Sequence, residues 1–360
     1  MPAVQGKRRS SSLPLYDDDD MPPPKKTGGL YSDDEEPDTS TSVTGSATIN
    51  NSDETPNGGD ATTEQTSMSS IDGHETVKGS EPLQLISVLG CRRGQREDMQ
   101  DAHLLIEDLS LNLTFVKRCA LFAIFDGHAG TRAAKYCEDK LPDVLKKKLS
   151  SYSDLSTLEK QLKRVFAETF KSIDEGFLAE ARKTKPVWKD GTTVTCVLLL
   201  NDSLYVANLG DSKAIVCRSK DGGFSHIELT VNHNPTMYEE RVRIQKAGGT
   251  VKDGRVNGII EVSRSIGDGQ FKTYGVTCIP DMKKLTITER DRFLILACDG
   301  LWKSFGNEEA ITYVNELLEK SAKGETDKEI WQKMADDLAA EAVRRRCGDN
   351  VSVILLRLHK

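Results

Sequence analysis

The stretch "TVTCVLLLNDSLYVANLGDSKAIVC", residues 193–217, decides the fold class because it holds three β-rich runs with no helix between them. Only the short turn sequences NDS (residues 201–203) and GDS (residues 210–212) separate these runs. Such short turns predict that the strands they join are antiparallel neighbours. A doubly wound parallel sheet would instead need a helix after nearly every strand. The stretch therefore indicates an α+β domain.

Further β-rich runs and clustered helical patterns lie on both sides of this stretch. The other candidate strands are LQLISVLG (83–90), DAHLLIED (101–108), CALFAIFD (119–126), RFLILACD (292–299) and NVSVILLRL (350–358). Amphipathic periodicity predicts helices over 130–149, 157–182, 236–247, 307–318 and 327–346. Thr236 and Glu239 have the spacing of a capping box, and Gly248 follows as a stop signal. We expect a central antiparallel β-sandwich with pairs of helices on its outer faces.

The first 80 residues differ in composition from the rest of the 360-residue chain. They contain 15 acids and 6 bases and no Phe or Trp, whereas residues 81–360 contain 41 acids and 43 bases. A segment so poor in apolar side chains cannot offset the entropy of ordering, so residues 1–80 are predicted to be a disordered tail and residues 81–360 the folded domain. "KRRSSS" (7–12) has three interpretations: a nuclear signal, a site for a basophilic kinase, or a solvated charge run.

The near-neutral charge of residues 81–360 gives no indication of nucleic-acid or membrane binding. Four of the eight cysteines (Cys119, Cys196, Cys217 and Cys298) lie inside apolar runs, and no CxxC pair occurs. These features, with no N-terminal hydrophobic segment and no run of about 18 apolar residues, favour reduced thiols and a cytoplasmic or nuclear protein without a membrane span.

Several apolar strands begin or end at an aspartate. A single Asp-Gly pair is usually only a turn, but here the acids follow long apolar runs and would converge if those strands are neighbours. The recurring acids are Asp126 in "AIFDG", Asp211 in "ANLGD", Asp299 in "LACDG", Asp349 in "CGDNVSV", Asp268 in "RSIGDG" and Asp101 in "MQDAH". Convergent carboxylates repel one another unless a cation lies among them, so the pattern predicts a metal site.

Oxygen ligands without a Cys or His ligand spacing favour Mg²⁺ or Mn²⁺ over zinc. Two such ions about 3.5–4 Å apart, bridged by one carboxylate and one hydroxide, are the usual machinery for attack on a phosphate ester. Asp126 is the candidate bridging ligand, and the carbonyl of Gly127 could complete the site.

Phosphate hydrolysis also needs a cation for the phosphate oxygens and an acid for the leaving group. Arg96 fits the first role because its planar guanidinium matches phosphate, and His128 fits the second. His103 is more readily interpreted as a structural hydrogen-bonding residue. Arg96 and Asp101 would point to opposite faces of a regular strand, so both serve one site only if a bulge intervenes or Arg96 precedes the strand.

Six ordered motifs resemble those of the metal-dependent serine/threonine phosphatases of type 2C, over about residues 82–358. They are "FAIFDGHAG", "DGTTVTCVLL", "LYVANLGDSKAIV", "EVSRSIGDGQFK", "LACDGLW" and "GDNVSVILL". The stretches "KPVWKDG" (185–191) and "HNPTMYEERVRIQKAGG" (233–249) resemble most the members associated with integrin-linked kinase, which makes that kinase a candidate partner. Phosphoproteins are the implied substrates, and a monomer is the implied state.

The resemblance also implies a role for each acid. Asp126 would bridge two ions and the Gly127 carbonyl would bind one of them, while Asp299, Asp349 and Asp268 would serve the other. Asp101 would hold metal-bound water, and Asp211 would join Asp268 at a weaker third position. Arg96 would hold the phosphate, His128 would be the general acid, and Cys298 would not be a nucleophile.

One departure from the family pattern is Gln100, where many members have Glu. Because of this difference, the metal affinity or the pH optimum can differ from that of those members. Residues 231–260 resemble the flap that shapes substrate choice in the family. Two rival interpretations remain: a pseudophosphatase that serves as a binding scaffold, and a phosphatase that acts on a small metabolite. The presence of Asp126, Asp268, Asp299 and Asp349 disfavours the first.

Overall fold

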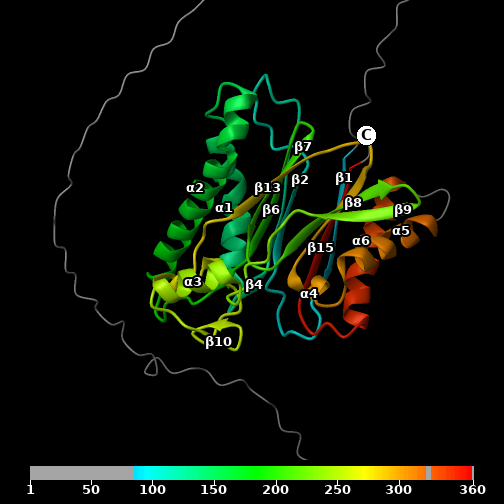
Figure 1. Ribbon diagram of the computed structural model, residues 1–360. Coiled ribbons are helices and arrows are strands. Elements are labelled where there is room, and N and C mark those ends of the chain that lie inside the picture. The colour runs from blue at the N-terminus through cyan, green and yellow to red at the C-terminus, as the bar shows by residue number, and fades with distance from the viewer. Residues whose placement is uncertain (1–84, 322–325, 359–360) are drawn as a thin grey trace, which may run out of the picture. The chain divides into compact units, whose positions relative to one another are not determined.

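The computed structural model describes residues 85–321 and 326–358, so the predicted tail over residues 1–80 lies outside the described residues. This part of the chain contains two five-stranded antiparallel sheets (Figure 1). The first sheet runs in the order β1 (Ile86–Arg92), β15 (Val351–Arg357), β14 (Asp291–Ala297), β8 (Lys213–Lys220) and β9 (Gly223–Glu228). The second runs in the order β13 (Asp281–Thr286), β7 (Ser203–Leu209), β6 (Val194–Leu200), β3 (Cys119–Phe125) and β2 (Ala102–Ile106).

The two sheets pack face to face because their central strands are apolar on both faces. In β3, Phe122 and Ile124 belong to the core between the sheets, whereas Leu121 and Phe125 belong to the core beneath the helices. This alternation follows from the two-residue period of a strand. A strand that is buried on both faces is the expected partner of a second sheet on one side and of helices on the other.

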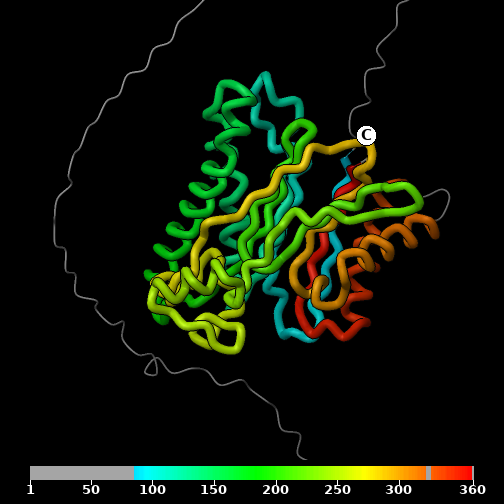
Figure 2. The backbone as a smooth tube through the Cα atoms, in the orientation of Figure 1, coloured from blue at the N-terminus to red at the C-terminus, as the bar shows by residue number. Residues whose placement is uncertain are grey.

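Two pairs of helices cover the outer faces, so the domain has four layers, α-β-β-α (Figures 1 and 2). α1 (Arg132–Leu149) and α2 (Leu155–Ala181) pack on the second sheet. α5 (Asn307–Glu319) and α6 (Asp327–Arg344) pack on the first, next to the short α4 (Asp299–Trp302). The predicted α+β sandwich flanked by helix pairs is confirmed.

The turn GDS does not join antiparallel neighbours as predicted. NDS does connect the paired strands β6 and β7, but at residues 210–212 the chain leaves β7 in one sheet and enters β8 in the other. Gly210 permits this crossing because its φ of +98° lies in the left-handed region. Asp211 is thereby placed where the two sheets meet.

The predicted capping box at Thr236 and Glu239 is also wrong. α3 (Tyr238–Lys246) begins later, after Met237, and no side chain caps it. Asn234 engages the residue that was expected to cap the helix. Its Oδ1 accepts hydrogen bonds from the Thr236 N–H (2.9 Å) and from the Thr236 hydroxyl (2.8 Å). This local Asx-type turn satisfies Thr236 outside the helix.

A small three-stranded sheet continues the second sheet beyond the end of β3. β5 (Gly191–Thr192) lies at its centre, between β4 (Gly127–His128) and β12 (Ile266–Gly267). The register pairs Gly191 with both His128 and Gly267. Segments more than 70 residues apart in sequence therefore deliver His128 and Asp268 to one place.

The flap, residues 231–260, contains α3 and the hairpin of β10 (Val251–Lys252) and β11 (Arg255–Val256). A small apolar cluster that includes Ile244 and Val256 holds it together. The short helix η1 (Lys272–Tyr274) follows close by.

A buried carboxylate ties the flap to the segment that leads into β12. Glu240, which is 3% exposed, accepts from Arg243 at 2.7 Å, from Arg264 at 2.7 Å and from the Ser263 hydroxyl at 2.5 Å. Burial alone would raise the pKa of Glu240, but these donors hold it well below its usual range. Glu240 therefore stays ionised and fixes α3.

All eight cysteines are free thiols. Among the described helices, none is long and apolar enough to cross a membrane.

Replacing Glu240 with Gln leaves Arg243 without its charge partner and leaves Arg264 with Asp281 alone, and breaking such a buried pair costs about 3–5 kcal/mol. We expect Glu240→Gln to lower the free energy of unfolding by about that amount in urea titrations. The control is Glu316→Gln, which removes the exposed pair with Lys320 and should change stability by less than about 1 kcal/mol. Equal effects of the two variants would contradict this account of the flap.

Candidate metal centre

Carboxylates from both sheets meet at one end of the sandwich. Asp126 follows β3, Asp211 follows β7 through Gly210, and Asp299 follows β14 and begins α4. One oxygen from each of these three carboxylates lies within 4.8 Å of the others. A second group within the same limit joins Asp126 to Asp101 and to the thiol of Cys298. Asp126 thus belongs to both groups, which is the geometry expected of a bridging ligand.

Asp101, just before β2, is 7% exposed and has one satisfied carboxylate oxygen and one unsatisfied. Oδ2 accepts from the Ser352 hydroxyl at 2.7 Å, whereas the buried Oδ1 has no hydrogen-bond partner among the described residues. A buried oxygen without a partner costs free energy unless a cation or water binds it. The orphaned oxygen therefore fits a hard metal ion.

Burial, and then the charges of neighbouring acids, raise the pKa values of the acids in the cluster. Burial raises the pKa of Asp126 well above its ordinary value, and the charges of Asp101 and Asp299 add to that effect. Burial raises the pKa of Asp101 to about 6. Burial and the charge of Asp299 raise that of Asp211 to about 6. Repulsion of this kind is relieved by a divalent cation, so the donor set fits Mg²⁺ or Mn²⁺.

Main-chain contacts fix the position of Asp126 at the strand end. Its N–H donates to Thr193 Oγ1 at 3.3 Å, and the Thr193 N–H donates to the Asp126 carbonyl at 2.9 Å. The next residue must be small: a Cβ added to Gly127 would lie 2.3 Å from the carbonyl oxygen of Gln100. The close approach of these two backbones leaves no room for a side chain at residue 127.

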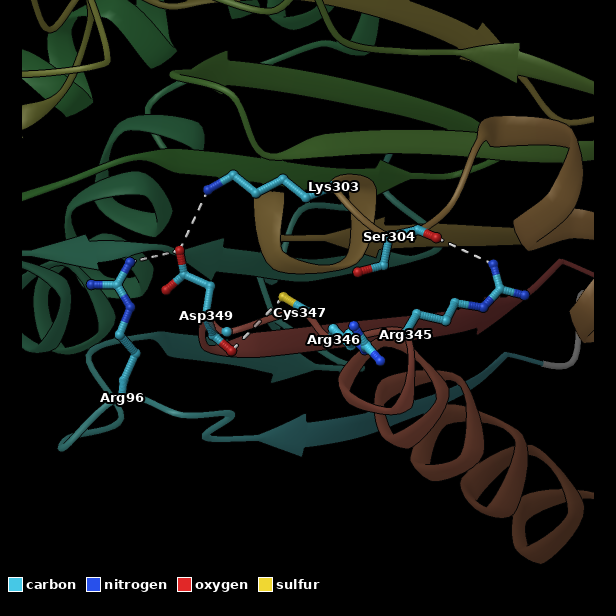
Figure 3. A pocket seen from close by; sticks show the side chains of 8 residues that line it. Arg96, Lys303, Ser304, Arg345, Arg346, Cys347 and Asp349 are labelled. Atoms are coloured by element: carbon cyan, nitrogen blue, oxygen red, sulfur yellow. Dashed lines mark hydrogen bonds and ion pairs between the residues drawn. The ribbon is translucent and has the colours of Figure 1, made fainter. Parts of the chain in front are cut away.

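A lysine lies among the acids at the edge of the cluster. Lys303 Nζ is 2.5 Å from Asp299 Oδ2 and 3.4 Å from Asp349 Oδ2. Arg96 reaches the same oxygen of Asp349 at 2.9 Å, as Figure 3 shows. Burial lowers the pKa of Lys303, but the charge of Asp299 more than offsets it, so Lys303 stays protonated. Two cations thus border the carboxylates.

His128 is held by Asp268 beside the cluster. Asp268 is only 2% exposed. Its Oδ2 lies 2.8 Å from His128 Nε2 and also accepts a hydrogen bond from the Ser265 hydroxyl at 2.6 Å. Burial lowers the pKa of His128, but the nearby Asp268 carboxylate outweighs it and the net shift is upward. The imidazole therefore binds protons more readily than a free histidine.

Residues 87–351 match the family model described as protein phosphatase 2C. The chain belongs to the protein phosphatase 2C family. It is 46% identical over 279 residues to the integrin-linked kinase-associated serine/threonine phosphatase 2C of Bos taurus, a match covering 74% of this chain and 75% of that protein. The Homo sapiens protein of the same name is also 46% identical, over 74% of this chain and 71% of the relative.

Solved structures share the fold at lower identity. A serine-threonine phosphatase 2C from Toxoplasma gondii superposes with a TM-score of 0.65 at 21% identity, covering 78% of this chain and 96% of that one. A C. elegans sex determining protein gives 0.64 at 23%, covering 78% and 66%. The chain is therefore a serine/threonine protein phosphatase of the 2C family, and that family is metal-dependent.

Within this phosphatase 2C domain, the structure brings together most of the residues predicted from the sequence. Arg96 lies in the loop before β2 and Asp101 lies directly before that strand. The two residues therefore do not lie on opposite faces of one regular strand, and they can serve the same site. Asp211 groups with Asp126 and Asp299, and its predicted role with Asp268 at a third position stays a prediction. Asp268 and Asp349 contact His128 and the two cations respectively, and their roles as metal ligands stay predictions.

Sequence reasoning missed Lys303. The signal was present, because Lys303 stands four residues after Asp299 and a helical turn places such residues on one face. Detecting it required knowing that "DGLW" forms that turn instead of continuing the strand. Ser265, which shares Oδ2 of Asp268 with His128, was also missed and carries no sequence signal.

The raised pKa values predict a pH-dependent effect of metal on stability. Asp101 and Asp211, with pKa values of about 6 in the folded protein and about 4 when unfolded, keep protons that the unfolded chain releases. The metal-free protein should therefore lose stability as pH rises from about 4 to 6. We expect Mn²⁺ to raise the melting temperature more at pH 7.5 than at pH 5, measured by calorimetry against EDTA. Asp211→Asn should reduce this difference. A pH-independent increment would contradict the carboxylate-repulsion account.

Gly191 provides a test of the His128–Asp268 pair. An added Cβ would lie 2.1 Å from Asp268 Oδ2 and 2.3 Å from His128 Nε2. Gly191→Ala should therefore displace both side chains and lower kcat by about a hundredfold, as misplacement by about 1 Å does elsewhere. Gly306→Ala, whose Cβ would meet nothing within 4 Å, is the matched control. Wild-type kcat in Gly191→Ala would show that the pair is not needed.

Proposed function

We propose that this chain hydrolyses phosphoserine and phosphothreonine in proteins with two divalent ions held around Asp126. The observation that carries the proposal is that Asp126 belongs to both groups of candidate ligands. Two ions so held would activate water as the nucleophile and neutralise charge on the phosphate. The Gly127 carbonyl would join Asp101 and Asp126 on one side. Asp299 and Asp349 would serve the other, with Asp211 beside them.

Cys298 is excluded from the ligand set on chemical grounds. Its pKa is raised well above the ordinary value, chiefly by burial and then by Asp101 and Asp126. Its protonated thiol donates to the Asn350 carbonyl at 3.4 Å. A hard ion prefers the oxygens that surround this thiol, and a protonated thiol is a poor nucleophile. Neither metal binding nor covalent catalysis therefore needs Cys298.

Arg96 would bind the non-bridging oxygens of the phosphate. Its side chain is 59% exposed and, among the described residues, pairs only with the Asp349 carboxylate through Nη2, so the other edge of the guanidinium is available to an incoming anion. Bidentate pairing with phosphate suits this planar group. On substrate binding, Arg96 would exchange part of its contact with Asp349 for the phosphate.

His128 would donate a proton to the leaving serine or threonine oxygen. Asp268 engages Nε2, so Nδ1 is the nitrogen left for proton transfer, and the raised pKa keeps the ring protonated closer to neutral pH. Asp268 then acts by orienting the ring. Lys303 would balance the charge of Asp299 and Asp349 at the rim of the cluster.

The names of the relatives and the free thiols suggest a partner and a location in the cell. The mammalian relatives are named for an association with integrin-linked kinase. We propose integrin-linked kinase as a partner of this chain, to be tested by co-precipitation. We further propose that the protein acts in the cytoplasm, the nucleus or both, as its free thiols suggest.

The test of the proposed function is hydrolysis of a phosphothreonine peptide after metal is stripped and then restored with Mn²⁺ or Mg²⁺. We expect turnover only with metal, and its loss in Asp126→Asn, which removes the shared charge at nearly constant volume. Asp143→Asn, an exposed acid of α1, is the control. Circular dichroism should show that both variants fold.

Three results would contradict the proposal. Turnover by Asp126→Asn would show that Asp126 is not a ligand shared by two ions. Turnover restricted to small phosphorylated metabolites would favour the metabolite phosphatase. A folded chain that binds phosphopeptide but stays inert with metal would favour the scaffold, and Gln100→Glu would then test whether residue 100 is the cause.

A further inference from the structure

A basic hollow of about 420 Å³ opens beside the metal centre (Figure 3). Its lining includes Arg96, Lys303, Arg345, Arg346 and Asp349, so four cations face one acid. Asp349 and Lys303 are shared with the carboxylate cluster, which makes the hollow continuous with the candidate site. We call it the Arg346 pocket.

The cations of this pocket differ in how fully they are engaged. Arg345 is occupied: it pairs with Glu309 at 2.6 Å and Glu341 at 3.0 Å, and its guanidinium lies 3.8 Å from the centre of the Phe305 ring. Arg346 is exposed, and its side chain makes no hydrogen bond or ion pair with the described part of the chain. Arg346 is therefore the cation of the pocket whose side chain has no partner among the described residues.

The backbone at Arg346 is unusual for an arginine. α6 ends at Arg344, and Arg346 follows with a φ of +68°, in the left-handed region that glycine normally occupies after a helix. A non-glycine residue there carries a conformational cost. Basic side chains at the C-terminal end of α6 interact favourably with the helix dipole, which explains Arg344 and Arg345. The dipole does not require an arginine at residue 346, where the backbone conformation favours glycine.

We propose that the Arg346 pocket binds a second anionic group of the phosphoprotein substrate, a carboxylate or a further phosphate close in sequence to the phosphorylated residue. The inference rests on the proposed function. Each residue of an extended peptide spans about 3.4 Å, so a substrate with its phosphate at the metal centre carries flanking side chains past Arg96 and Asp349. Acids at those positions meet Arg346, and basic residues are repelled.

The test compares three phosphothreonine peptides of one length with the full chain and Mn²⁺: one with alanine flanks, one with aspartate flanks, and one with a phosphoserine nearby. We expect wild-type kcat/KM to be higher for both anionic peptides than for the alanine peptide. Arg346→Gly, which suits the left-handed backbone and should fold at least as well, should lower the anionic-to-neutral ratio by about three- to tenfold, through KM. Arg346→Lys should retain most of the preference. Arg344→Ala, which removes a pair with Glu341 away from the pocket lining, should leave the ratio unchanged.

Each result decides the matter. A fall of the ratio for both anionic peptides supports a general anion site, and a fall for one of them identifies which anion the pocket binds. An unchanged ratio in Arg346→Gly, including an equal loss on every peptide, would overturn the inference while leaving the proposed function intact. Failure of wild type to hydrolyse any of the peptides with Mn²⁺ would refute the proposed function and the inference with it.

Discussion

Repulsion among carboxylates at one end of the β-sandwich is the constraint on which the rest of the structure depends. Asp101, Asp126, Asp211 and Asp299 come from segments far apart in the sequence, yet Asp126 has an oxygen within 4.8 Å of Asp211 and Asp299 in one group and of Asp101 in another. Water cannot screen these charges fully at a partly buried position, so the pKa values rise. The fold tolerates this cost because the apolar strands behind the acids hold them in place.

The apolar core supplies that rigidity. Three of the acids follow strands that are wholly or almost wholly buried: Asp126 follows β3, Asp211 follows β7 and Asp299 follows β14. The chain crosses from one sheet to the other at Gly210, and this crossing brings Asp211 to the other acids. Rearranging the acids would require rearranging both sheets, so the ligands stay preorganised. The cations Arg96 and Lys303 lie outside these strands, on a loop and at the end of a helical turn, where they can respond to substrate.

The fold class and the acids could be predicted from local patterns. Long apolar runs separated by short turns predicted strands, and their terminal aspartates predicted that several acids converge at one edge. What could not be predicted depended on contacts between distant segments. The crossing at Gly210 looks in sequence like an ordinary hairpin turn. The cap at Thr236 was lost to Asn234, two residues upstream, because a side chain can satisfy a neighbouring backbone in more than one way. The pairing of Asp268 with His128 depends on β5 lying between β4 and β12, and no spacing rule encodes that.

The central claim is that Asp126 is shared by two ions, and electron paramagnetic resonance of the protein loaded with Mn²⁺ tests it most directly. Two Mn²⁺ ions about 4 Å apart and joined by one carboxylate should give the spectrum of an exchange-coupled pair once two equivalents are bound. In Asp126→Asn that coupled spectrum should disappear. A wild-type protein that shows only isolated Mn²⁺ at saturation, or coupling that persists in Asp126→Asn, would contradict the account.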